Sequence, residues 1–393
     1  MNLQNNKVIP LATPCLSGNE ERYLVECVRS NFVSSVGPFV NLFEKNLCAQ
    51  TGFKHAVAVS SGTAALHLAL LACGVMKDDL VIMPTYTFIA TANAISHCGA
   101  KPWFFDISPV DWNLDIDKVR NVIEKETYRD QHGTLRHIST HQRVSALVPV
   151  FCMGMPIDFT KAMDLAKEYN FKLVVDAAAG IGSKSNGFAI GEMEMDASIM
   201  SFNGNKNITS GGGGCVLTNN IDIANKASHL STTGKVGVDY DHDCVAFNYR
   251  MTNLQAAVGC AQLEQLDKFV QRKREIDQYY RENIKSDFVR FFPRVASRVS
   301  SGWLSGLLLS FEDIGSLIET LKSQGVESKF FWKPIHHQKP YCKNLKQNVE
   351  FSESLWDKVI VLPSSASLTQ VEQNKICGIV NNYFDEKKNY EFI

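Results

Sequence analysis

The chain has 393 residues, of which 45% are hydrophobic and 21% charged, a globular composition with room for a large core and two domains. Its 40 basic and 41 acidic residues give a formal net charge of −1, which argues against nucleic-acid binding because that function requires a basic excess. The 11 cysteines are scattered without a CxxC pair, as expected of reduced thiols in a cytoplasmic protein.

The amino-terminal stretch MNLQNNKVIP is polar and has no apolar core of the kind found in signal sequences. The longest apolar runs, such as the one at 145–157, are too short to span a bilayer. We therefore expect a cytoplasmic protein that contacts no membrane.

The first predicted element is a helix that opens with the capping-box pattern SGNE at 17–20 and runs towards Ser30. Short β-rich runs then alternate with helical patterns, of which the apolar helix at 63–74 and the amphipathic helix at 155–170 are the clearest. A polar, histidine-containing stretch near 124–144 is expected to be a loop or insertion. The predicted strands lie at 55–61, 80–84, 101–107, 145–151, 171–179, 196–202 and 213–220. This alternation predicts a mainly parallel sheet with helices on both faces.

The pattern changes after about residue 250. Thr252 and Gln255 form a second capping-box pattern, which predicts one long helix through about Asn283. A strand at 306–311, a helix near 314–324 and a final helix opened by Thr369 and Glu372 follow. We therefore predict an α/β protein with a large domain at 1–250 and a smaller α+β domain at 251–393. The amino-terminal segment is a candidate to pack with the small domain.

An acid and an amine follow two successive strands of the predicted sheet. Asp176 ends one strand, and Lys206 lies just beyond the next. Ligands of open α/β sheets bind at the carboxyl ends of the strands, so both groups are expected at one cleft. Taken singly, Asp176 is typical of a turn or helix cap, and Lys206 of a solvated surface residue.

A possible anion site joins a strand to the apolar helix at residues 60–64 (SSGTA). Free amides at the start of a helix, together with small and hydroxylated residues, bind anions, although a simple helix cap explains the same residues. Ser201 offers a further hydroxyl. The glycine run at 211–214 is no P-loop of a nucleotide hydrolase, because Lys206 precedes the glycines and no Ser or Thr follows a Gly-Lys pair.

Phe88 lies just past a strand end, where an aromatic ring can stack on a planar ligand, although a core position is the simpler interpretation. An acid, an amine, a phosphate cradle and a ring platform together match pyridoxal phosphate. This cofactor requires a lysine for its Schiff base, an acid at its pyridinium nitrogen and a cup for its phosphate.

No metal site is expected. The acidic run at 239–243 and the histidines at 137 and 141 are interpreted as solvated surface loops. The histidine pair at 336–337 is interpreted as part of a substrate cleft.

Six ordered motifs resemble those of the DegT/DnrJ/StrS sugar aminotransferases over nearly the whole chain. They are VSSGTAALHLAL, VIMPTYTFIATANAISHCGAKPWFFDI, DAAAGIGS, SFNGNKNITSGGGG, FNYRMTNLQAAVGCAQLEQLD and FWKPIHHQKPY. The resemblance implies the fold-type-I aspartate aminotransferase architecture, with pyridoxal phosphate as cofactor.

The resemblance also assigns roles to individual residues. Lys206 is expected to be the Schiff-base lysine, Asp176 the pyridinium partner and Phe88 the stacking ring. Asn248 is expected to reach the phosphate from a neighbouring subunit, which implies a homodimer with composite active sites. His336 is expected to line the sugar side of the cleft. The phosphate is expected to be held by Gly62, Thr63, Ala64 and Ser201.

The motifs LSGNE, FVSSVGPFV and SFNGNK are similar to those of the bacillosamine and legionaminic-acid branch. This similarity implies amination of UDP-4-keto-6-deoxy-N-acetylglucosamine at C4, with glutamate as donor. GDP- and dTDP-linked keto-sugars are the alternatives. A pyridoxamine-phosphate-dependent dehydratase and a non-catalytic protein are less favoured, because Lys206 and Asp176 are both present.

The chain also departs from the family pattern. Ala179 replaces a polar residue common in the family, Phe151-Cys152 stands where many relatives have a histidine, and GGGG replaces GEGG. None of these changes touches Lys206. The stretch at 124–144 is longer than usual and has no assigned role.

Overall fold

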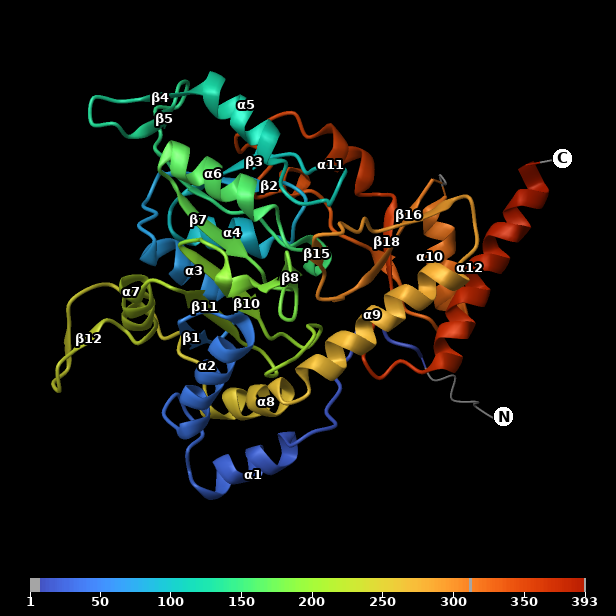
Figure 1. Cartoon of the computed structure of the whole chain (residues 1–393), viewed down its shortest axis with the longest axis horizontal. Coiled ribbons are helices and arrows are strands. Elements are labelled where there is room, and N and C mark those ends of the chain that lie inside the picture. Colours follow the sequence, from blue (N-terminus) through green and yellow to red (C-terminus); the bar gives the residue numbers. More distant parts are fainter. Residues whose placement is uncertain (1–7, 311–312, 392–393) are drawn as a thin grey trace.

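The computed structural model describes residues 8–310 and 313–391, and it has the expected α/β architecture (Figure 1). A seven-stranded sheet forms the centre of the large domain, and β11 alone runs antiparallel to its neighbours. The other strands of the sheet run parallel, as predicted from the alternating pattern. In spatial order the strands are β1 (His55–Val59), β11 (Gly214–Thr218), β10 (Ala197–Ser201), β7 (Lys172–Asp176), β6 (Val144–Leu147), β2 (Leu80–Pro84) and β3 (Lys101–Phe105).

Two apolar cores cover the two faces of this sheet. Successive side chains of a strand point to opposite faces, so Val57 and Val59 join one core while Ala58 joins the other. The first face is covered by α3 (Gly62–Ala72), α4 (Ala90–His97) and α7 (Ile221–Ser231). The second is covered by α2 (Pro38–Thr51), α5 (Ile116–Glu126), α6 (Phe159–Tyr169) and α8 (Asn253–Leu263). The helix α1 (Glu20–Arg29) packs on α8.

The small domain is an antiparallel sheet with helices and has a third core. Its strands, in spatial order, are β14 (Val289–Phe291), β16 (Ser305–Leu309), β18 (Val359–Leu362) and β17 (Lys329–Phe330). Its helices are α9 (Leu266–Asn283), α10 (Ile314–Ser323) and α12 (Gln370–Glu391). The amino-terminal segment joins this domain, because Ile9 bridges to Val326.

Short elements complete the chain. They are α11 (Glu350–Leu355), the hairpin of β4 (Thr127–Arg129) and β5 (Leu135–His137), the hairpin of β12 (Lys235–Val236) and β13 (Asp241–His242), the small sheet of β8 (Lys184–Ser185), β9 (Phe188–Ala189) and β15 (Arg298–Val299), and the 3-10 turns η1 (Cys152–Gly154), η2 (Ile190–Glu192) and η3 (Ile335–His337).

The single helix predicted from Thr252 to Asn283 is wrong. The capping box is present, with the Gln255 amide donating to Thr252 Oγ1 at 3.3 Å. The helix ends at Leu263, however, and a new one begins at Leu266. α8 packs on the large domain, whereas Figure 1 shows α9 extending towards the small domain. α9 itself packs on both domains, with Phe269 and Val270 in the core of the large one and Ile276 and Tyr280 in that of the small one. The division at residue 250 stays a prediction.

The first predicted capping box is also wrong. α1 begins at Glu20 without a side-chain cap. The Glu20 carboxylate instead accepts the Gly18 amide at 2.8 Å and the Gln262 side-chain amide at 2.6 Å. A tertiary contact has therefore replaced the local one.

The stretch at 124–144 contains the β4–β5 hairpin rather than only loop. His137 is buried, with its ring centroid 5.0 Å from that of Trp103, so the prediction of a surface position was wrong for this residue. Within the described residues, no helix combines the length and the apolar character needed to cross a membrane.

Candidate active site

A cavity of about 870 Å³ lies between the carboxyl ends of the large-sheet strands and the small domain. Its walls include most of the residues singled out from the sequence. The large domain contributes residues 60–63, 87–91, 176, 178–179, 201, 203 and 205–206, and the small domain contributes 303–304 and 327–333.

Asp176 is the last residue of β7, and its side chain is held from two sides. Thr91 Oγ1 donates to Oδ2 at 2.8 Å, and the Ala178 amide donates to Oδ1 at 3.1 Å. The residue is 6% exposed, and this burial raises its pKa, while both hydrogen bonds and the charge of Lys206 act in the opposite direction. A buried carboxylate of this kind favours a cationic partner.

Lys206 lies in the loop after β10, which pairs in parallel with β7 and aligns Ile199 with Asp176. The residue is half-buried, and its Nζ lies 3.9 Å from the centroid of the Trp303 ring. Loss of solvation lowers the pKa of Lys206 to about 8, against the opposing field of Asp176. Lys206 can therefore exchange a proton near neutral pH.

The start of α3 packs very closely on the end of β10. A Cβ on Gly62 would lie 2.8 Å from Ser201 Cβ, so only glycine fits there. The first amides of a helix have no intrahelical partner, which makes this end, with the Ser201 hydroxyl beside it, suited to an anion. The amide of Ala64, which was expected to contact that anion, donates to Ser61 Oγ at 3.1 Å instead, and Ala64 does not line the cavity.

The glycine run after Lys206 has a packing role. A Cβ on Gly214 would lie 2.4 Å from the Ser61 carbonyl oxygen. β11 therefore starts directly against the turn that carries the candidate anion site.

Phe88 and Asn248 occupy different positions relative to the cavity. Phe88 lines it with a ring that is 59% exposed, as a stacking platform requires. Asn248 is exposed and lies outside the lining of its own chain's cavity.

His336 does not line the cavity in the structure, contrary to expectation. Its Nδ1 lies 2.6 Å from Thr85 Oγ1, and its Nε2 lies 3.0 Å from Glu353 Oε1. Burial is the main cause that lowers the pKa of His336. The flanking residues Ile335 and Gln338 reach the cavity instead.

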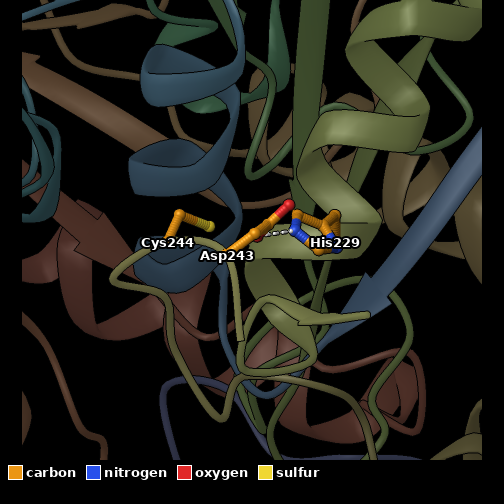
Figure 2. Close-up of side chains that lie close together, drawn as sticks. All are labelled: His229, Asp243 and Cys244. Atoms are coloured by element: carbon orange, nitrogen blue, oxygen red, sulfur yellow. Dashed lines mark hydrogen bonds and ion pairs between the residues drawn. The ribbon is translucent and has the colours of Figure 1, made fainter. Parts of the chain in front are cut away.

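Two groups of potential metal ligands occur among the described residues, and neither lines the cavity. Figure 2 shows His229, Asp243 and Cys244 near the β12–β13 hairpin, where His229 Nε2 and Asp243 Oδ1 are 2.6 Å apart. The second group comprises His336, His337 and Glu353. Glu353 also lies 3.6 Å from the Lys346 amine, whose positive charge disfavours a cation. The absence of a metal site stays a prediction.

Sequence reasoning missed Thr91 and Trp303. Thr91 lies in the first turn of α4, four residues after Thr87, and the hydroxyls of the two residues lie 3.2 Å apart. Trp303 comes from the other domain, and no local pattern connects it with Lys206.

Comparisons with known proteins agree on one family. A sequence model described as the DegT/DnrJ/EryC1/StrS aminotransferase family matches residues 14–381. The chain is 36% identical to a GDP-perosamine synthase of Vibrio cholerae over 96% of this chain and 100% of that protein. A DegT/DnrJ/EryC1/StrS aminotransferase from Brucella abortus is 25% identical, with a TM-score of 0.84 over 93% of this chain and 95% of the other. The Helicobacter pylori aminotransferase PseC, involved in pseudaminic acid biosynthesis, is 24% identical, with a TM-score of 0.87 over 97% of this chain and 100% of the other, and supports the fold alone.

Proposed function

Because the chain belongs to the DegT/DnrJ/EryC1/StrS aminotransferase family, we propose that it moves an amino group from glutamate to C4 of a nucleotide-linked 4-keto-6-deoxy sugar. The membership itself makes the chain a sugar aminotransferase that uses pyridoxal phosphate. The single observation that carries the finer proposal is the full-length similarity to a GDP-perosamine synthase, which makes a GDP-linked sugar the first candidate.

A UDP-linked N-acetyl sugar is the second candidate. It is favoured by the motifs LSGNE, FVSSVGPFV and SFNGNK, which resemble those of the bacillosamine and legionaminic-acid branch.

The residues around the cavity fit the cofactor. Asp176 offers a buried carboxylate, Lys206 an amine, and the close contact of Gly62 with Ser201 leaves a helix start open to a phosphate. Phe88 offers an exposed ring at the same cavity. When bound, the cofactor supplies an electron-withdrawing ring that stabilises negative charge on the carbon next to the amino nitrogen.

Two side chains of this protein would direct the chemistry. Asp176 would stay ionised and hold a proton on the ring nitrogen of the cofactor, because a charged partner offsets the loss of hydration of its carboxylate. Lys206, with a pKa lowered to about 8, would take a proton from the donor's α-carbon and return it to the cofactor carbon on the other side of the transferred nitrogen. The partly enclosed site would limit the access of water to both groups.

The small-domain wall would bind the nucleotide sugar. Lys329 and Lys333 line the cavity and suit the negative charge of a diphosphate. Phe330, Phe331 and Trp332 lie between them and offer rings to the base or sugar. A second copy of the chain would contribute Asn248, whose exposure leaves it available to a partner.

The proposal is tested by incubating the purified enzyme with glutamate and a panel of GDP-, UDP- and dTDP-linked 4-keto-6-deoxy sugars. The mass of the aminated product identifies the substrate, and Lys206→Ala serves as the inactive control. We expect the GDP-linked sugar to react with the highest kcat/KM. Amination of the UDP-linked N-acetyl sugar alone would establish the second candidate, and no amination of any sugar would refute the proposal.

A further inference from the structure

The ring of Trp303 faces the Lys206 amine. The separation of 3.9 Å between Nζ and the ring centroid is well within the range of a cation–π contact. Trp303 is 4% exposed and lines the cavity, so little water competes for the ammonium on that side. The contact favours the charged form of the lysine, because a neutral amine has no comparable attraction to the ring.

Trp303 is fixed in place by groups on both sides of Lys206. Its indole Nε1–H donates to the Asn205 carbonyl at 2.7 Å. Two residues earlier in the small domain, the Ser301 carbonyl accepts the Asn207 side-chain amide at 2.7 Å. The lysine loop is therefore tied to the Trp303 segment through both chain neighbours of Lys206.

A buried lysine supports the same segment from behind. Lys273 on α9 is 3% exposed, and its Nζ donates to the Trp303 carbonyl at 3.2 Å and to the Ser364 carbonyl at 2.6 Å. This contact joins Trp303 to the chain that follows β18. The Trp303 backbone is thus held by the small domain, whereas its indole N–H is held by the Lys206 loop of the large domain.

We propose that Trp303 is a positioning residue that holds the Lys206 ammonium whenever the amine is not bonded to the cofactor. The lysine must leave the cofactor in each half of an amino transfer and then return protons to nearby atoms. A fixed aromatic ring keeps the released amine inside the cavity and restricts its side-chain freedom. The inference rests on the aminotransferase activity and is independent of the identity of the sugar.

The ring also acts on the proton affinity of Lys206. Among the described residues, Asp176 is the ionisable group whose field acts on Lys206, and it favours the ammonium. Loss of solvation acts in the opposite direction and prevails, since the pKa is lowered to about 8. Weakening the ring's attraction should therefore lower this pKa further.

The test replaces Trp303 site-specifically with tryptophans that carry one to four ring fluorines. Fluorine withdraws electron density from the ring face but keeps its shape and its N–H, so the hydrogen bond to Asn205 and the packing remain. The pKa of Lys206 is measured in the full-length, cofactor-free chain from the pH dependence of its labelling by a limiting amine reagent, read by peptide mass spectrometry. The matched control is the same series at Trp103, which is fully buried in the large domain and does not line the cavity.

We expect the pKa of Lys206 to fall with each fluorine at Trp303, by roughly half a unit to one unit over the series. The Trp103 series should leave it unchanged. A flat or rising dependence at Trp303, or equal slopes in the two series, would overturn the proposal. These readings need no nucleotide sugar, so a failed substrate panel leaves the test intact.

Discussion

Replacing Gly62 with alanine probes the contact between the start of α3 and the end of β10. The added Cβ would meet Ser201 Cβ at 2.8 Å and Ser201 Oγ at 3.2 Å. Carbon atoms in contact prefer about 3.5–4.0 Å, so the helix start must move away from the strand by several tenths of an ångström. Ser201 is buried at a strand end and has little room to yield.

The expected effect on stability follows from two opposing contributions. Overpacking of a close contact costs about 1–3 kcal/mol, whereas replacing glycine within a helix gains about 0.5–1 kcal/mol. We therefore expect Gly62→Ala to lower the free energy of unfolding by about 1–2 kcal/mol. Displacement of the helix amides from the cofactor phosphate should also weaken cofactor binding at least tenfold, which corresponds to about 1.4 kcal/mol.

The assay combines urea unfolding of the cofactor-free protein with titration of pyridoxal phosphate. The control is Gly378→Ala on α12, where an added Cβ meets nothing within 4 Å. This control should raise stability by about 0.5–1 kcal/mol and leave cofactor affinity unchanged. If Gly62→Ala behaved like the control in both measurements, the argument for a tight phosphate cradle would be refuted.

Two further predictions concern the buried charges. Asp176→Asn keeps a side chain that can contact Thr91 and the Ala178 amide but loses the charge. A charged hydrogen bond contributes roughly 1.5–3 kcal/mol, so we expect amino transfer at saturating substrate to slow by about 10- to 100-fold. Single-turnover rates near those of the wild type would contradict this expectation. Burial lowers the pKa of Lys273 to about 8, whereas its value in the unfolded chain is about 10.4. Between these two pH values the unfolded chain binds more protons than the folded one, so the contribution of Lys273 to stability rises with pH. The unfolding free energy of the wild type, measured against that of Lys273→Met, should therefore increase by up to about 3 kcal/mol from pH 7.5 to pH 10.5, and a constant difference would show that Lys273 is not desolvated.

Much of the candidate site could be predicted because it depends on local patterns. Asp176 and Lys206 each follow a buried strand, and parallel strands place their carboxyl ends at one edge whatever their exact order. The small residues around Gly62 lie between a strand and an apolar helix, so they also mark a helix start from local sequence alone. The acid, the amine, the anion site and the aromatic ring together pointed to pyridoxal phosphate, and the family motifs then implied the same cofactor.

Two of the errors arose where a distant contact outweighed a local one. The Glu20 side chain contacts Gln262 and closes no capping box. Ala64 is a local exception, because its amide donates to the Ser61 side chain that caps the same helix. His336 lies within a cavity-wall motif, yet hydrogen bonds to Thr85 and Glu353 turn its ring away from the cavity lining. For Glu20 and His336, a partner far along the chain decides the side-chain direction.

The sequence by itself determined the alternation of strands and helices, the family, and the acid and amine of the candidate site, because these depend on hydrophobic periodicity, on ordered motifs and on residues near strand ends. Only the tertiary structure decided the break between α8 and α9, the burial of His137 and the approach of Trp303 to Lys206. The break between the two helices arises because α8 packs on the large domain, whereas α9 extends towards the small one. The approach of Trp303 depends on how the small domain sits on the large one, and that placement comes from the sum of many distant contacts rather than from any local pattern.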